Sequence, residues 1–402
     1  MSLKTLNRRL EAASPSATYK IIDRVAARRA EGARIISLCA GEPDFDTPEH
    51  IRAAAISAID SGHTRYTQVA GLRALREAIA RKFQRENGLD VSWQDTLVCS
   101  GGKQVIFNAL AATLNDGEEV VIPAPYWVSY PEMVQLCGGE SRIVTCGAES
   151  SFKLTPQALS EAIGPNTRWV ILNSPSNPTG AVYEREELKE LAEVLLTHPH
   201  VLILADDIYE HLIFDGRDFL TLAQVEPRLA MRTLTMNGVS KAYAMTGWRI
   251  GFATGPNWLL EAMEKLQGQQ TSGACSVSQH AAIAALDGPK DFIAHSREVF
   301  QRRRDFMVQL LNEAPGISCG TPGGAFYAFA DCSGLIGKRS AGGRELVDDE
   351  AVAVALLEEA NVAVVQGSAF GLPGYLRIAY ALDDESLRGA CEAIHGFCES
   401  AR

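Results

Sequence analysis

Several features that would point to particular classes of protein are missing from this sequence. No apolar run reaches the roughly 20 residues that a membrane-spanning helix needs. There is no block of basic residues, and 38 Lys and Arg against 49 Asp and Glu give a net charge of −11. An acidic chain of this kind lacks the basic patch that binds nucleic acid or an anionic membrane surface. We therefore expect a soluble globular protein whose partners are small molecules, with no nucleic acid and no membrane.

The nine cysteines form no recognisable framework. Their number is odd, they are scattered along the chain, and no two have the CxxC spacing. A disulfide scaffold or a cysteine zinc site is not expected, and this use of cysteine fits a reducing cytoplasm. The first residues lack the apolar segment of a secretory signal. The HPH stretch at 198–200 has no further ligand near it in sequence, so we expect no metal site.

What the sequence does contain is an alternation of apolar strand patterns and helical patterns. Short β-rich runs separated by helices predict an α/β fold with a mainly parallel sheet that is covered on both faces. The pattern changes from about residue 290: a long helix over 297–314 is followed by short strands and a Gly-rich insert, which predicts a smaller α+β unit. Strands are expected at 96–100, 118–123, 167–174, 200–207, 232–240 and 249–255.

Polar residues follow several of these strands where each strand ends. They are GGK at 101–103, NPTG at 177–180, the acidic pair at 206–207 and SK at 240–241. Ligands of parallel α/β sheets bind at the carboxyl ends of the strands. The candidate functional residues are therefore expected along one edge of the sheet.

Two basic residues stand out near the last of these strand ends. Lys241 follows a buried strand pattern, and a lysine amine forms a Schiff base with an aldehyde when burial lowers its pKa. Arg249 lies among glycines in TGWRIG and has the geometry to bind a phosphate. Backbone N–H groups of SGGKQ (100–104), between a strand and a helix, also suit an anion. The alternatives are a surface lysine, a surface salt bridge and an ordinary tight turn.

Asp206 and Asp207 end an almost purely apolar strand. A carboxylate there is costly unless it is paired, so one of them is a candidate for holding a positive charge such as a protonated pyridine nitrogen. Capping of a helix over IYEHL (208–212) is the alternative, and it suits Asp207 equally well. Tyr209 would lie near Asp206 in either case.

Three further side chains are candidates, each with a structural alternative. Asn177 in NSPSNPTG has an amide for a ligand oxygen or for a turn, and we expect a cis peptide bond before Pro178. Trp127 suits stacking on a flat ring or packing in a core. Arg377 alternates with apolar neighbours in YLRIAYA, so an inward guanidinium needs an anion, either a substrate carboxylate or a structural acid.

Taken together and in order, these residues resemble the fold-type I, class I aminotransferases that depend on pyridoxal 5'-phosphate. The ordered set is AGEPDF, TRYT, GGKQ, PYWVSY, NPTG, DDIY, SKxxxMTGWRxG, GAFY and LRIAYA, spread over nearly the whole chain. Such an ordered set is far more specific than any single motif. The resemblance implies a seven-stranded, mainly parallel sheet in a large domain at 47–295. It further implies a smaller α+β domain at 296–402, with 1–46 as an N-terminal arm and the first part of the small domain.

By this resemblance one group of residues would bind pyridoxal 5'-phosphate. Lys241 corresponds to the lysine that carries the cofactor as a Schiff base and later moves the substrate's proton. Asp206 corresponds to the aspartate on the pyridine nitrogen, and Tyr209 with Asn177 to the pair on the phenolic oxygen. Trp127 corresponds to the aromatic residue stacked on the ring.

The phosphate would be held by Ser240, Arg249 and the backbone N–H groups of Gly101, Gly102 and Lys103.

A second group would bind the substrate or the neighbouring subunit. Arg377 corresponds to the arginine that binds the α-carboxylate, helped by Gly41, Asn177 and Trp127. Tyr66 corresponds to a tyrosine that reaches the phosphate of a neighbouring subunit, so the resemblance implies a homodimer with shared active sites.

The resemblance is greatest to the bacterial aspartate aminotransferase branch. The segment QGQQTSGACSVSQ (267–279) has no arginine for a distal carboxylate, whereas Lys103 and the hydroxyls of Ser14, Ser16 and Thr18 match that branch. Gly-Ala-Cys in that segment departs from the branch pattern, which suggests a wider specificity. The expected reaction is transfer of an amino group from L-aspartate to 2-oxoglutarate by a ping-pong mechanism. Prephenate, aromatic or neutral substrates, and a β-eliminating lyase, are the alternatives.

Overall fold

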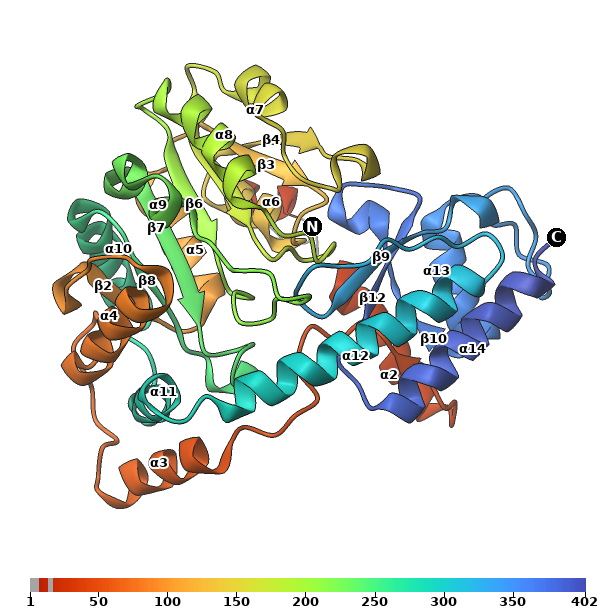
Figure 1. Ribbon diagram of the computed structural model, residues 1–402, viewed down its shortest axis with the longest axis horizontal. Coiled ribbons are helices and arrows are strands. Elements are labelled where there is room, and N and C mark those ends of the chain that lie inside the picture. The colour runs from red at the N-terminus through yellow and green to blue at the C-terminus, as the bar shows by residue number, and fades with distance from the viewer. Residues whose placement is uncertain (1–6, 14–16) are drawn as a thin grey trace, which may run out of the picture.

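A seven-stranded sheet fills one side of the molecule, and two small sheets lie on the other side (Figure 1). The computed structural model describes residues 7–13 and 17–402. The strand order in the large sheet is β2-β8-β7-β6-β5-β3-β4. Only β8 runs antiparallel to its neighbours, and the remaining pairs are parallel. The strands are β2 (Thr96–Cys99), β3 (Glu119–Ala124), β4 (Glu140–Thr145), β5 (Thr167–Asn173), β6 (Leu202–Asp206), β7 (Thr233–Gly238) and β8 (Gly251–Thr254).

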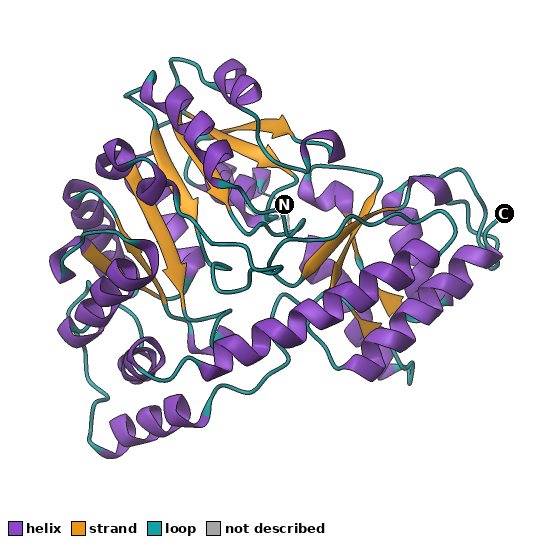
Figure 2. Cartoon of the chain, viewed as in Figure 1, coloured by secondary structure: helices purple, strands orange, loops and turns teal. Residues whose placement is uncertain are grey.

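Helices cover both faces of this sheet (Figure 2) because its central strands are apolar on both sides. Along β5, Trp169 and Ile171 pack with helices α5, α6 and α10, whereas Val170 and Leu172 pack with helices α7 and α8 on the other face. This alternation is the period of two that a strand imposes. The helices are α5 (Gly102–Thr113), α6 (Ser129–Leu136), α7 (Pro156–Ala162), α8 (Arg185–Leu196) and α10 (Asn257–Gln270).

The rest of this side consists of shorter or more peripheral helices. Helices α3 (Glu49–Asp60), α4 (Arg73–Asn87) and α11 (Ser276–Asp287) share a second core with the β2 and β8 end of the sheet. The short α9 (Leu222–Val225) lies beside α8. Helix α1 (Arg8–Ala12) contacts α6.

The smaller sheets form the other side. An antiparallel sheet has the order β11-β12-β9, and a two-stranded parallel sheet joins β1 to β10. The strands are β1 (Ile36–Ser37), β9 (Tyr327–Asp331), β10 (Val362–Ala363), β11 (Val365–Gln366) and β12 (Tyr375–Ala379). The helices of this side are α2 (Ala17–Ala30), α13 (Asp349–Glu359), α14 (Asp384–Ser400) and much of the long α12 (Asp291–Glu313), which extends from the large-sheet side across to the small one (Figure 1).

The predicted fold class is confirmed, with small differences at individual elements. Strand β4 was not predicted, because ESRIVT is charged and mostly exposed at the sheet edge. The long helix begins at Asp291, ahead of its predicted start. Within the described ranges no helix has the length and apolar character required to cross a membrane. The division into domains at residues 46 and 295 stays a prediction, and β1 pairs with β10 on the small-sheet side as that division supposes.

Candidate active site

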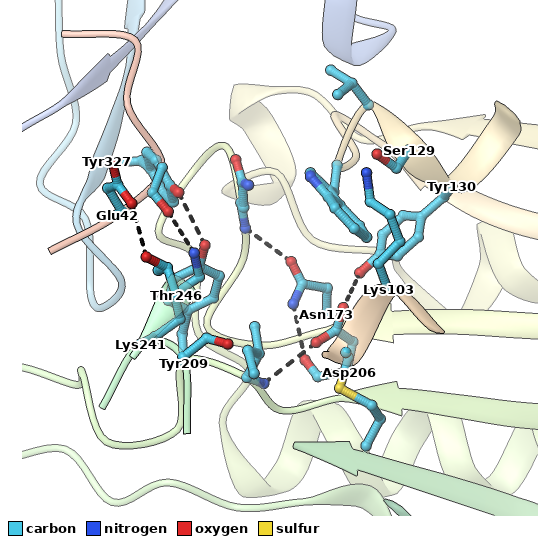
Figure 3. A pocket seen from close by; sticks show the side chains of 18 of the residues that line it. Glu42, Lys103, Ser129, Tyr130, Asn173, Asp206, Tyr209, Lys241, Thr246 and Tyr327 are labelled. Carbon is cyan, nitrogen blue, oxygen red and sulfur yellow. Dashed lines mark hydrogen bonds between the residues drawn. The ribbon is translucent and has the colours of Figure 1, made fainter. Parts of the chain in front are cut away.

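A cavity of about 550 Å³ lies between the large sheet and the small antiparallel sheet. Adjacent strands of the large sheet end side by side here, since Asn173 of β5 is in register with Asp206 of β6. Figure 3 shows the labelled side chains converging on the cavity. Most of the residues predicted from the sequence line it: Gly41, Gly102, Lys103, Trp127, Asn177, Asp206, Tyr209, Ser240, Lys241, Arg249 and Arg377.

Lys241 follows the end of the fully buried strand β7 and extends into this cavity. Its Nζ donates a hydrogen bond to the backbone oxygen of Gly41, a residue on the small-sheet side (Figure 3). Burial lowers the pKa of Lys241 to about 8, and the Arg249 and Arg377 guanidinium groups add to this, while Glu42 and Asp206 oppose it. About a tenth of Lys241 is therefore an uncharged, nucleophilic amine at pH 7, far more than for an ordinary lysine. This is the property that Schiff-base chemistry needs.

Asp206, the last residue of β6, is 3% exposed. Burial raises the pKa of Asp206 to about 6, although hydrogen bonds from the Tyr130 hydroxyl and the Ile208 backbone N–H oppose the rise. The Tyr130 hydroxyl lies 2.5 Å from one carboxylate oxygen, and the Ile208 nitrogen lies 3.3 Å from the other. A buried carboxylate held in this way is suited to a cationic partner in the cavity.

Asp207 is buried beside Asp206, but the proposed capping function is wrong. Residues 208–211 form a turn, not a helix. Burial raises the pKa of Asp207 well above its usual value, and its Oδ2 has no hydrogen-bond partner among the described residues. Tyr209 comes from the same turn and its phenol lines the cavity.

Arg249 stands at the edge of the cavity just before β8. Its backbone is left-handed (φ 55°), and Nη1 donates to the backbone oxygen of Thr246 at 2.8 Å. A Cβ atom on Gly101 would lie 2.2 Å from Nη2 of Arg249, so only glycine lets the guanidinium approach this turn. Gly101 precedes α5, whose first residues Gly102 and Lys103 line the cavity. An arginine therefore lies against a helix N-terminus, and both groups favour an anion.

Arg377 comes from the middle of β12 and is 3% exposed. Nη2 donates to the backbone oxygen of Cys39 at 2.7 Å, and Nη1 lies 3.3 Å from Oδ1 of Asn177. Its Nε has no hydrogen-bond partner among the described residues. No carboxylate that the structure describes pairs with it, so the predicted alternative of a structural acid is not supported. A buried guanidinium with an unused donor is a site for an anionic ligand.

The predicted cis peptide bond before Pro178 is confirmed, and the Ser174–Pro175 bond is also cis. The backbone N–H of Asn177 donates to Asn173 Oδ1 at 2.9 Å, which fixes the turn after β5. The Asn177 side chain is thereby placed at the cavity wall beside Arg377.

Trp127 and Lys103 lie together near the mouth of the cavity. The Lys103 ammonium is 5.0 Å from the centre of the Trp127 ring, which in turn packs edge-on against Tyr130 with centroids 5.4 Å apart. Partial burial and the charge of Arg249 lower the pKa of Lys103. Trp127 is half-buried and also lines the cavity. Its position therefore suits both functions considered from the sequence, stacking on a flat ring and packing in a core.

Other predicted residues lie elsewhere. Tyr66 is 93% exposed and does not line this cavity, a placement that is compatible with a function in a neighbouring subunit. Ser14 and Ser16 lie outside the described residues, and Thr18 is in α2 but its side chain is not described.

The structure adds groups that the sequence reasoning did not assign. Tyr130 donates to Asp206, Tyr327 contacts the Tyr209 hydroxyl, and the amide of Asn173 donates to the Asp206 backbone oxygen at 2.9 Å. Glu42 lines the cavity and accepts a hydrogen bond from Thr246 at 2.8 Å. Tyr130, Tyr327 and Glu42 lie within the motifs PYWVSY, GAFY and AGEPDF, so the only signal was membership of a motif.

One group of possible metal ligands occurs within residues 7–13 and 17–402, outside the cavity. Glu86, Glu210 and His211 place ligand atoms within 4.8 Å of one another. The buried ammonium of Lys82 pairs with Glu210 and lies 3.7 Å from Glu86. This cluster therefore already contains its own cation.

Comparison with known proteins agrees with this geometry. The family model of aminotransferase class I and II matches residues 33–394. The chain is 58% identical over 384 residues to an aspartate/prephenate aminotransferase of Cereibacter sphaeroides, covering 96% of each chain. It is 51% identical over 391 residues to an aspartate aminotransferase of Rhizobium meliloti, covering 97% of this chain and 95% of the relative.

Solved structures give the same result. The crystal structure of the aspartate aminotransferase from Rhizobium meliloti superposes with a TM-score of 0.97 at 50% identity, covering 99% of this chain and 100% of that one. The aspartate aminotransferase from Thermus thermophilus with maleate superposes with a TM-score of 0.92 at 41% identity, covering 98% and 100%. The family model matches most of the chain, and the relatives and solved structures named above match nearly all of it. The chain therefore belongs to the class I and II aminotransferases.

Proposed function

We propose that the protein transfers the amino group of L-aspartate to 2-oxoglutarate by a ping-pong mechanism, using pyridoxal 5'-phosphate bound in the cavity of about 550 Å³. The observation that carries the proposal is the placement of Lys241 in one cavity with a buried carboxyl, Asp206, and a buried guanidinium, Arg377. The relatives named as aspartate aminotransferases support the choice of amino donor.

The residues of the cavity fit this cofactor. Asp206 is a buried carboxyl at the end of the sheet, and no cation in the described part of the chain is bonded to it, which suits a protonated pyridine nitrogen. Arg249 against the turn at Gly101, with Ser240 and the first N–H groups of α5, suits a phosphate. The half-buried face of Trp127 suits a flat ring, and Tyr209 with Asn177 suits a phenolic oxygen.

The chemistry depends on Lys241. When bound, the cofactor withdraws electrons from the substrate and makes its Cα–H bond acidic. Lys241 is the residue that would hold the cofactor through its aldehyde. Its amine, whose pKa burial lowers to about 8, would take up the Cα proton of the substrate and later release it.

The substrate is held from the small-sheet side. Arg377 has an unused Nε donor and faces the cavity, so it is the group we assign to the α-carboxylate. Asn177 and the backbone of Gly41 lie beside it. Lys103 at the cavity mouth is the positive charge that we assign to the distal carboxylate of a dicarboxylic substrate.

Prephenate is the second candidate substrate, because a relative that is 58% identical is named for both aspartate and prephenate. Prephenate carries two carboxylates, as aspartate does, so Arg377 and Lys103 would serve both substrates. A β-eliminating lyase is a third reading, and it would release ammonia from a substrate with a β-leaving group without any oxo acid.

Lys103→Ala tests the assignment of substrate. We expect kcat/KM for aspartate and for prephenate to fall about tenfold or more, while a neutral amino acid changes less than about twofold. Lys189→Ala is the control, since Lys189 is exposed on α8 and pairs only with Glu186. An equal loss for charged and neutral substrates would reject Lys103 as the distal carboxylate group.

We also propose that the protein is a cytoplasmic homodimer with shared active sites, built from the three segments 1–46, 47–295 and 296–402. Tyr66 is 93% exposed, and Ile56 and Ile59 of α3 are 60% and 54% exposed, which supports a covering partner. All nine cysteines are free, as is usual in a reducing compartment. A monomer in sedimentation at working concentration would reject the shared site.

A further inference from the structure

Tyr327 lies where the two sides of the cavity meet. It is the first residue of β9, on the small-sheet side, and it is 1% exposed. Its hydroxyl is 3.0 Å from the hydroxyl of Tyr209, which comes from the large-sheet side (Figure 3). The carbon of the Arg377 guanidinium is 4.8 Å from the centre of its ring. One side chain thus touches a group assigned to the cofactor and a group assigned to the substrate.

The direction of the hydroxyl contact follows from the function proposed for Tyr209. Burial raises the pKa of both phenols, so each keeps its single proton at neutral pH. Among the described residues, the Tyr327 hydroxyl makes no hydrogen bond other than the one to Tyr209. Either hydroxyl could donate in this contact, but once Tyr209 gives its own proton to the phenolic oxygen of the cofactor, as the proposed function has it, Tyr327 must be the donor to the Tyr209 oxygen. The Tyr209 proton is then free for an acceptor in the cavity, and the incoming bond strengthens it as a donor.

The surroundings hold Tyr327 in this position. A Cβ atom on Gly41 would lie 2.8 Å from the Tyr327 oxygen, so glycine at that place leaves room for the hydroxyl. The ring packs against Phe326 with centroids 4.7 Å apart and against Tyr209 with centroids 5.8 Å apart. The Arg377 guanidinium also lies 5.0 Å from the ring of Phe370, so two aromatic rings hold this cation together with its hydrogen bonds to Asn177 and Cys39.

We propose that Tyr327 is a positioning residue with two separable functions in the aminotransferase reaction. Its hydroxyl directs the Tyr209 proton toward the phenolic oxygen of the cofactor, and its ring helps to hold the Arg377 guanidinium in place for the substrate α-carboxylate. This inference rests on the proposed function, because it takes the cofactor and the substrate to be bound as described above.

Tyr327→Phe removes only the hydroxyl and so tests the first function. A weaker donor at Tyr209 leaves the phenolic oxygen less stabilised as an anion. The pH at which the bound cofactor changes its visible absorption should therefore rise by about half a unit to one unit, and kcat should fall about three- to tenfold. The dissociation constant of maleate, a dicarboxylate probe that is not turned over, should stay within about twofold because the ring over Arg377 remains.

Tyr327→Leu removes the ring as well and tests the second function. Maleate should then bind about five- to thirtyfold more weakly than to the Phe variant, with a matching rise in KM for aspartate. Tyr183→Phe is the matched control, since it deletes another buried phenol oxygen, one that accepts the Leu154 N–H at 2.8 Å away from the cavity. It should change neither the absorption midpoint nor maleate binding. Circular dichroism checks that each variant is folded.

A failure of the function proposed for Tyr327 can be distinguished from a failure of the aminotransferase function itself. If the wild-type protein gives no pH-dependent cofactor band, the proposed function itself fails. If the wild type gives the band and the Phe variant has the same midpoint, the hydroxyl function is wrong. If the Phe and Leu variants change the midpoint and maleate binding together and equally, Tyr327 is only a packing residue.

Discussion

The two sides of the cavity are built differently. The large-sheet side supplies Asp206, Lys241 and Arg249 from the ends of strands or the turns beside them, where the backbone leaves the sheet. The small-sheet side supplies Arg377 from the middle of β12, where strands on both sides fix the backbone, and Tyr327 from the start of the neighbouring edge strand β9. The groups that we assign to the cofactor thus lie at strand ends, and those that we assign to the substrate carboxylate lie within a second sheet.

Some of the contacts between the two sides involve the functional groups themselves. Lys241 donates to Gly41, Arg377 to Asn177, and Tyr327 lies against Tyr209. A ligand that takes over any of these hydrogen bonds therefore changes a contact between the two sides. We therefore expect the binding of a substrate to be coupled to the relative position of the two sheets.

The largest effect is expected on the cofactor side. Lys241→Ala removes both the anchoring amine and the base, so kcat should fall about 10⁴-fold or more, with the fold retained. Steady-state kinetics and far-UV circular dichroism measure this. Turnover close to that of the wild type would show that another base acts, and the assignment of the whole cofactor side would be lost.

A smaller effect is expected on the substrate side. Arg377→Lys keeps the positive charge but loses the planar set of donors, so kcat/KM for aspartate should fall about 30- to 1000-fold, mainly through KM. Arg388→Lys is the control, because Arg388 is an exposed residue of α14 that stacks on Phe306. A loss confined to kcat would mean that Arg377 acts with the cofactor groups. It would contradict the distinction between a cofactor side and a substrate side of the cavity.

The smallest effect concerns stability and pH in cofactor-free protein. The pKa of Lys241 is lowered from 10.5 to about 8, so the folded state binds this proton less firmly than the unfolded state. The cost of burying the charge is complete below pH 8 and disappears as the pH rises toward 10.5. The wild type should therefore gain stability relative to Lys241→Met across this interval, measured by urea unfolding. A constant difference between the two proteins would mean that the folded pKa is not lowered.

Much of the fold was predictable because apolar runs and strand-end polar groups are local signals. Strands β5, β6 and β7 lie where runs such as WVIL and LILA predict them, and the residues after them reach one cavity. The charged edge strand β4 escaped prediction, because nothing buried marks it. The sequence did not decide whether residues 208–212 form a turn or a helix, because IYEHL suits both.

The missed parts of the site depend on pairs of distant residues. Tyr130 meets Asp206 across 76 positions and Tyr327 meets Tyr209 across 118, and no local pattern specifies such partners. Tyr66 illustrates the same limit in another way, since its proposed partner belongs to a second chain. Sequence patterns thus locate the reacting groups, whereas the groups that orient them follow only from the packed structure.

The central claim is that Lys241 holds a cofactor that accepts the amino group of aspartate. The most direct test is the visible absorption spectrum of the protein loaded with pyridoxal 5'-phosphate, before and after L-aspartate is added without any oxo acid. The account predicts a protein-bound band that converts to that of the amine form of the cofactor and returns when 2-oxoglutarate is added. A band that aspartate leaves unchanged would contradict the assigned amino donor, and no band at all would contradict the assignment of Lys241.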